Sequence, residues 1–118
     1  CQQYILVKGS EDRFRDFVFV DDVVEAFIAA YKRESNDYLD VNISNARKTT
    51  VKELISLIQD NIPFDVKTEF KGSTSGDIFG IVGNNSKAFD TLNWKPKIKL
   101  EEGLKDMIEW ALKLKTQE

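Results

Sequence analysis

The chain has no histidine and a single cysteine among its 118 residues. Without an imidazole group, the protein cannot use histidine as a general base or as a metal ligand. Cys1 has no partner for an internal disulfide, and this favours a reducing compartment such as the cytoplasm. Histidine-based catalysis and histidine-ligated metal centres are therefore excluded for this chain, and we expect no metal site.

Long apolar runs and an excess of basic charge are missing as well. No stretch of the sequence is apolar over the length that crosses a bilayer, and no signal-peptide pattern is present, so we expect no membrane partner. The 17 basic and 20 acidic residues give a net charge of -3, which disfavours nucleic acid as the main partner. The hydrophobic share of 42% and the charged share of 31% are typical of one soluble globular domain.

Strand patterns and helix patterns alternate along the chain, which indicates an α/β or α+β fold. Short β-branched and aromatic runs between turn residues predict strands, and apolar residues spaced three and four apart predict helices. The predicted strands are residues 4–8, 16–20, 38–43 and 65–70. The four predicted helices run from about 22 to 33–36, from 51 to a point before Pro63, from 85 or 86 to 92, and from 100 to 115.

Two helix starts carry a capping-box pattern, in which a short polar residue is followed three positions later by glutamate. Asp22 with Glu25 predicts one such start, with Asp21 as the alternative cap, and Thr50 with Glu53 predicts the other. We expect the two aspartates to act as cap and helix-dipole partners rather than as ligands.

The two tryptophans are more simply explained as packing residues than as nucleotide-stacking ones. Trp94 follows the third predicted helix, and Trp110 lies within the last one. Large aromatic side chains bury much apolar area, so both are expected to anchor the core. On the first predicted helix, Val23, Ala26 and Tyr31 belong to an apolar stripe with the same purpose.

Tyr4 and Lys8 have the Y-x-x-x-K spacing of the catalytic pair of short-chain dehydrogenases. Side chains four apart on a helix are neighbours, but on a strand they are about 13 Å apart. Because this segment is predicted to be a strand, we reject the pair as catalytic.

Three stretches, taken in order, resemble the C-terminal third of the extended short-chain dehydrogenase/reductase family. That family contains the NAD-dependent sugar-nucleotide epimerases and dehydratases, the UDP-glucose 4-epimerase-like enzymes. Each stretch is weakly specific alone, but their order and spacing make the match strong, and together they cover nearly all of the chain. The matching stretches are "GSEDRFRDFVFVDDVVEAF", "VNISNARKTTVKELI" and "GDIFGIVGNNSKAFDTLNWKPKIKLEEGLKDMIEWA".

The resemblance implies that the chain is the substrate-binding portion of an enzyme whose N-terminal Rossmann domain is absent. In the family that domain binds NAD and carries the catalytic Ser/Thr, Tyr and Lys, so residues 1–118 alone should be inactive and should hold no cofactor. The start at Cys1 rather than methionine fits a piece of a longer polypeptide. The implied partners are a nucleotide-diphosphate sugar and the chain's own Rossmann domain, and a homodimer is left open.

The resemblance also implies a binding site for the nucleotide. The family's "RDF" arginine, which contacts the diphosphate, corresponds to Arg15, and its "GD" aspartate, which contacts the ribose, corresponds to Asp77 next to Gly76. A guanidinium fork suits phosphate oxygens, and a carboxylate can accept from two ribose hydroxyls. Thr74 stands where many members have an arginine. The second phosphate contact is then missing, or one of three other cations supplies it: Arg13, Arg47 or Lys71.

Plainer interpretations stand beside this one. Arg15 could pair with Asp12 or Asp16 on the surface, as most exposed ion pairs do. Asp77 could be a turn residue, which is the commoner use of Ser-Gly-Asp. The chain could also be a stand-alone, non-catalytic interaction or ligand-binding module of the same fold, and the loop with Thr74 in place of arginine favours that alternative.

Overall fold

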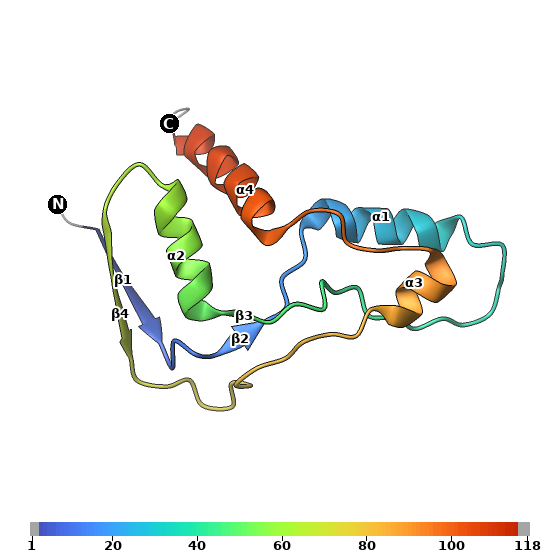
Figure 1. The fold of residues 1–118 in the computed structure, drawn as a ribbon, viewed down its shortest axis with the longest axis horizontal. Helices are drawn as coiled ribbons and strands as arrows, with labels where there is room; N and C mark the ends of the chain where they lie inside the picture. Colours follow the sequence, from blue (N-terminus) through green and yellow to red (C-terminus); the bar gives the residue numbers. More distant parts are fainter. Residues whose placement is uncertain (1–2, 116–118) are drawn as a thin grey trace.

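Residues 3–115 form four short strands, which pair two by two, and four helices (Figure 1). A computed structural model of the chain describes residues 3–115. The elements in order are β1 (Gln3–Lys8), β2 (Phe14–Arg15), α1 (Val20–Tyr31), β3 (Thr49–Thr50), α2 (Val51–Asn61), β4 (Val66–Lys71), α3 (Ser86–Leu92) and α4 (Leu100–Lys115).

The strands β1 and β4 form a parallel pair, and α2 lies beside them (Figure 1). The register places Gln3 opposite Val66 and Lys8 opposite Lys71. The Gln59 side chain on α2 donates to the Val66 carbonyl oxygen at 2.8 Å, which ties the helix to the strand that follows it. In β4 half-buried and exposed residues alternate, as the sequence pattern predicts for a strand with one covered face.

The second strand pair, β2 with β3, brings together segments that are far apart in the sequence. It is antiparallel, with Phe14 opposite Thr50 and Arg15 opposite Thr49. Phe14 also forms a bridge with Gly80, and its ring lies where a side chain at Gly80 would have to be. Since Gly80 has no side chain, the loop that follows β4 can approach β2 closely.

One predicted helix start is confirmed and the other is wrong. The Thr50 hydroxyl oxygen accepts from the Glu53 backbone N–H at 3.1 Å, so Thr50 caps α2. Helix α1 instead begins at Val20, with Phe19 in the cap position and no side-chain cap. Asp21 and Asp22 lie inside its first turn, where their charge still suits the helix dipole.

Asp22 does not cap α1 because its carboxylate faces inward and binds the segment before α4. Both of its oxygens accept from the Lys97 backbone N–H at 3.1 Å, and Oδ2 also accepts from Ile98 at 3.0 Å. Asp22 is 2% exposed. The aspartate therefore joins the first helix to the start of the last one.

Two predicted strands, residues 16–20 and 38–43, are not formed among the described residues. In the first, the Asp16 carboxylate accepts backbone N–H groups from Asn45 and Ala46, at 2.8 and 2.9 Å, which takes the place of a strand ladder. The segment 38–43 has no neighbouring strand within residues 3–115. A strand needs a partner for its backbone groups, so its alternating pattern alone does not produce one.

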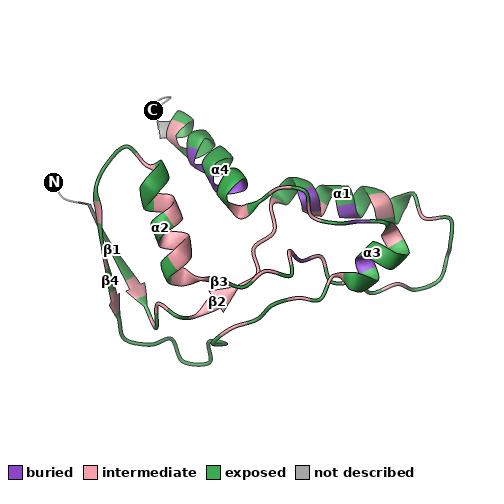
Figure 2. Cartoon of the chain, in the orientation of Figure 1, coloured by how far each residue is buried: buried purple, intermediate pink, exposed green. Residues whose placement is uncertain are grey.

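The core is small and lies between α1, α3 and the segment after α3 (Figure 2). Trp94 is 4% exposed, as predicted, and its indole N–H donates to the Asp22 carbonyl oxygen at 2.8 Å. The prediction for Trp110 is wrong, since that residue is 63% exposed. The buried hydrophobic residues among those described are Ala26, Ala88, Trp94, Leu104 and Ile108.

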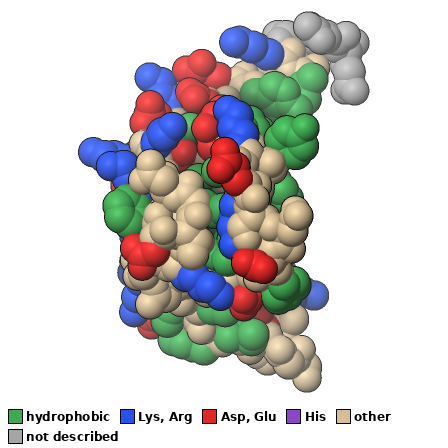
Figure 3. All heavy atoms as spheres, turned by 90° about the vertical axis from the view of Figure 1, so that its right-hand side faces the viewer, with side chains coloured by type: hydrophobic (Ala, Val, Ile, Leu, Met, Phe, Trp, Pro, Cys, Tyr) green, Lys and Arg blue, Asp and Glu red, His purple; other side chains and the backbone are tan. Residues whose placement is uncertain are grey.

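The molecule is flat and extended, and it exposes much apolar surface. Its extents are 57 × 37 × 21 Å, and its radius of gyration is 17.4 Å, against about 13–14 Å for a compact domain of this length. Its accessible area of 8833 Å² exceeds the roughly 6,500 Å² expected of a compact monomer of this mass. Hydrophobic side chains lie among interspersed acidic and basic ones on the end shown in Figure 3.

None of the helices within residues 3–115 has the length and apolar character that crossing a bilayer requires.

Candidate nucleotide-binding site

Asp77 is held by a tight turn in the loop that follows β4. The Asp77 backbone N–H donates to the Thr74 carbonyl oxygen at 3.2 Å, and Gly76, the third residue of the turn, has a φ of 77°. Only glycine adopts that left-handed conformation readily at such a position. Thr74 and Gly76 therefore shape the backbone that presents Asp77, and all three are exposed.

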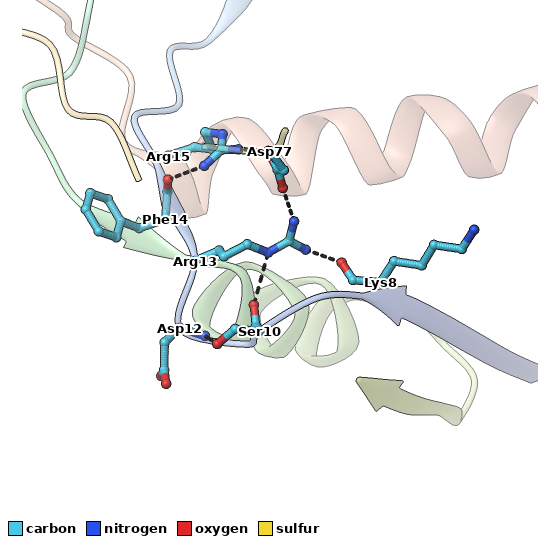
Figure 4. A network of polar contacts seen from close by, with 7 residues as sticks. All are labelled: Lys8, Ser10, Asp12, Arg13, Phe14, Arg15 and Asp77. Atoms are coloured by element: carbon cyan, nitrogen blue, oxygen red, sulfur yellow. Dashed lines mark hydrogen bonds and ion pairs between the residues drawn. The ribbon is translucent and has the colours of Figure 1, made fainter. Parts of the chain in front are cut away.

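Arg15, at the end of β2, reaches this turn directly. Its Nη2 lies 2.7 Å from Asp77 Oδ1, and its Nη1 donates to the Phe14 carbonyl oxygen at 2.8 Å. The two side chains come from positions 62 residues apart and are partly exposed, 35% for Arg15 and 25% for Asp77. The structure thus places two of the predicted site residues in contact (Figure 4).

Arg13 is a third member of this cluster. Its Nη1 donates to the second oxygen of Asp77, its Nη2 donates to the Lys8 carbonyl oxygen, and its Nε lies 3.3 Å from the Ser10 carbonyl oxygen. Figure 4 shows both guanidinium groups converging on the one carboxylate, while the Lys8 side chain extends away from it. Two guanidinium cations on one carboxylate leave an excess of one positive charge.

The other cations proposed for a second phosphate contact are placed differently. Arg47 joins the starts of α2 and α4, with its Nη2 2.7 Å from Glu53 and 2.9 Å from Glu101. That guanidinium lowers the pKa of Glu101 below its usual range, mainly through the side-chain hydrogen bond. Lys71 ends β4 beside Lys8. Of the three candidates, Arg13 is the one in contact with Asp77.

The plainer pairing of Arg15 with Asp12 or Asp16 is not found among the described residues. The Asp16 carboxylate accepts three backbone N–H groups, the third from Gly83 at 3.0 Å. It therefore joins the loop before β3, at residues 45–46, to the loop at Gly83. The sequence pattern does not predict this role. Nothing in the sequence pattern distinguishes Asp16, which holds loops, from Asp21, which faces solvent.

The described residues contain no group of three or more acidic, histidine or cysteine side chains that could hold a metal ion. Tyr4 and Lys8 both lie on β1, which agrees with the rejection of that pair as catalytic. The Tyr4 hydroxyl donates to Glu69, and this hydrogen bond raises the pKa of Tyr4. A tyrosine with a raised pKa is less ionised at neutral pH, so the shift is opposite to the lowered tyrosine pKa that such a catalytic pair would need.

Residues 1–107 match the profile of the family described as GDP-mannose 4,6 dehydratase. The chain belongs to that family. It is 36% identical over 103 residues to a UDP-glucose 4-epimerase of Rhizobium leguminosarum bv. trifolii. The matched residues cover 84% of this chain and 31% of that relative. The resemblance drawn from the three sequence stretches is therefore confirmed.

Solved structures of related proteins contain the same fold over nearly all of this chain. The crystal structure of UDP-glucose 4-epimerase with UDP-glucose from Thermotoga maritima has a TM-score of 0.83 at 34% identity, and it covers 96% of this chain and 35% of that one. MoeE5 in complex with UDP-glucose and NAD has a TM-score of 0.87 at 24% identity, over 93% and 37%. The α/β class is thereby confirmed, and the chain spans about a third of the relatives' length.

Proposed function

We propose that the chain is the substrate-binding portion of an NAD-dependent sugar-nucleotide epimerase or dehydratase, and that it grips the nucleotide diphosphate. The observation that carries the proposal is the contact between Arg15 and Asp77, which lie 62 residues apart and meet with an excess of positive charge. The relatives' names support the substrate class, because UDP-glucose is the ligand of the Thermotoga maritima epimerase.

In the proposed site, Arg15 binds the diphosphate and Asp77 binds the ribose. The guanidinium fork matches phosphate oxygens, and Arg15 is held at the end of a strand by its hydrogen bond to the Phe14 carbonyl oxygen. The Asp77 carboxylate accepts from ribose hydroxyls at the turn that Gly76 makes. Binding at this end of the substrate positions the sugar at the reacting centre.

NAD, which accepts a hydride from the sugar and returns it, is assigned to the part of the protein outside this chain. A dinucleotide pyrophosphate needs a glycine-rich turn between a strand and a helix. Among the described residues, a strand leads directly into a helix where β3 meets α2, and Thr50 and Val51 stand there instead of glycine. The described residues therefore do not fit the cofactor.

Calorimetric titration of the full-length protein with UDP, dTDP and GDP tests the proposal. We expect one of the three to bind in the micromolar to millimolar range, and we expect Arg15→Gln to weaken that binding about tenfold, since a charge-assisted hydrogen bond is lost. Failure of all three to bind at millimolar concentration would remove the proposed function.

We also propose that the chain's own N-terminal Rossmann domain covers the exposed apolar surface. A groove of about 290 Å³ runs between Phe19, Leu54 and Met107 and opens to solvent. Helix α1 is apolar on both sides, and such a helix is normally buried. Its exposed stripe consists of Val20, Val24, Phe27, Ile28 and Tyr31.

A stand-alone interaction module remains the second candidate, and the same exposed apolar surface favours it. The sequence encoded upstream of Cys1 separates the two. A glycine-rich nucleotide loop followed by a Y-x-x-x-K on a helix supports the enzyme, and a start codon directly before Cys1 supports the module.

A further inference from the structure

Arg13 and Arg15 share one carboxylate but are held very differently. Arg13 donates through Nε and both Nη atoms to three acceptors of the protein, and its side chain is 16% exposed. Arg15 uses Nη1 and Nη2 on two acceptors and is 35% exposed. A guanidinium has five N–H donors, so Arg15 has the larger unused share and the better access to a ligand.

The loop between β1 and β2 has a shape that suits Arg13. Gly9 has a φ of 102°, and a side chain there would come within 2.6 Å of the Arg13 guanidinium carbon. The carbonyl oxygens that hold Arg13 belong to Lys8 and Ser10, on either side of that glycine. Arg13 is therefore fixed before any ligand arrives, and it binds Asp77 from a set position.

We infer that Arg13 is a positioning residue, which holds and neutralises Asp77 so that Arg15 can exchange Asp77 for a phosphate. The inference rests on the proposed function. A diphosphate beside Asp77 brings like charges together, and that repulsion weakens binding unless the carboxylate keeps a cation. With Arg13 in place, Asp77 keeps its partner when Arg15 turns to the phosphate. Without Arg13, the diphosphate competes with Asp77 for the single remaining arginine.

A double-mutant cycle on the full-length protein separates this positioning role from a direct phosphate contact. The proteins to compare by UDP titration are the wild type, Arg13→Gln, Asp77→Asn and the double variant. We expect Arg13→Gln alone to weaken UDP binding about tenfold. In the Asp77→Asn background the same change should cost less than about twofold, because Arg13 no longer has a charge to neutralise.

Two results would overturn the inference. An equal tenfold loss in both backgrounds would mean that Arg13 binds phosphate directly, and an unchanged affinity of Arg13→Gln would mean that it has no role in binding. Arg13→Lys keeps the charge, so it should recover part of the affinity, and it replaces the glutamine variant if that variant does not fold. If Arg13 only shaped the loop, Arg13→Lys would not recover the UDP affinity.

Controls separate this inference from the proposed function. Arg33→Gln changes an arginine bound to the Asp37 carbonyl oxygen, away from the cluster, and should leave UDP affinity unchanged. If the wild type binds UDP and Arg15→Gln weakens it while Arg13→Gln does not, only the inference about Arg13 fails. If the wild type binds no nucleoside diphosphate, the proposed function fails first.

Discussion

Two adjacent aspartates in the first turn of α1 have opposite roles in stabilising the fold. Asp22 is 2% exposed and accepts backbone N–H groups from Lys97 and Ile98, whereas Asp21 on the same turn of α1 is exposed. Removing the Asp22 carboxylate leaves the partly buried N–H groups of Lys97 and Ile98 without an acceptor. Removing the exposed Asp21 carboxylate affects only groups that water can solvate. The two residues form a matched pair for measuring what a buried acceptor contributes.

We therefore expect Asp22→Ala to lower the free energy of unfolding by about 2–4 kcal/mol. Asp21→Ala should change it by less than about 0.5 kcal/mol, since exposed substitutions have small effects. Urea unfolding followed by tryptophan fluorescence measures both, because Trp94 binds the Asp22 carbonyl oxygen and reports on the same region. Equal effects of the two substitutions would contradict the assignment of Asp22 as the link between α1 and α4.

At the scale of elements, the ion pairs of Arg47 join the first turns of α2 and α4 and make that junction depend on pH. The Arg47 guanidinium lowers the pKa of Glu101 in the folded state. A depressed carboxyl pKa stabilises the fold above the unfolded value of about 4.3. That stabilisation is lost as the pH falls through the folded value.

Arg47→Gln should accordingly lower the melting temperature at pH 7 and have a smaller effect near pH 3. The loss at pH 7 is expected to be below about 1 kcal/mol, because Glu101 is 46% exposed and surface pairs are weak. Glu101→Gln is the matched control and should show the same convergence at low pH. A difference between wild type and Arg47→Gln that does not shrink on acidification would contradict this role of the pair.

Helices were predictable from the sequence because their signals are local, whereas strands depend on neighbours that the pattern does not reveal. The Thr50 hydroxyl caps α2 by accepting from the Glu53 backbone N–H, as predicted, and the predicted bounds of α3 and α4 match Ser86–Leu92 and Leu100–Lys115. Segment 38–43 has the right alternation but no partner strand in the described part of the chain, so it stays irregular.

The candidate site was predictable only in part, for a similar reason. The family resemblance predicts Arg15 and Asp77, but no pattern within the sequence places positions 62 residues apart in contact. The sequence offers three cations for the second phosphate contact, and Arg13 is one of them. Its selection required the fold, which turns the loop at Gly9 so that Arg13 and Arg15 meet the same carboxylate. Whether these residues bind a nucleotide stays a prediction.

At the scale of the whole molecule, the exposed area is the feature that most needs explanation. The accessible surface of 8833 Å² is about a third larger than a compact monomer of this mass would have. The relatives are about three times as long, since the chain covers 31% of the Rhizobium leguminosarum epimerase. The covering domain that we propose would account for both the flat shape and the apolar stripe on α1.

Ile28 tests this interpretation, because it lies within that stripe and is 40% exposed in this chain. In the full-length protein Ile28→Gln should lower stability by about 2 kcal/mol or more, as removal of a buried side chain does. In the 118-residue chain alone the same substitution should cost less than about 0.5 kcal/mol, because glutamine is a good helix former at a partly exposed position. Glu25→Gln on the same helix is the control and should be near neutral in both proteins. A small effect of Ile28→Gln in the full-length protein would mean that the stripe stays exposed there, and the excess area would then point to a separate partner.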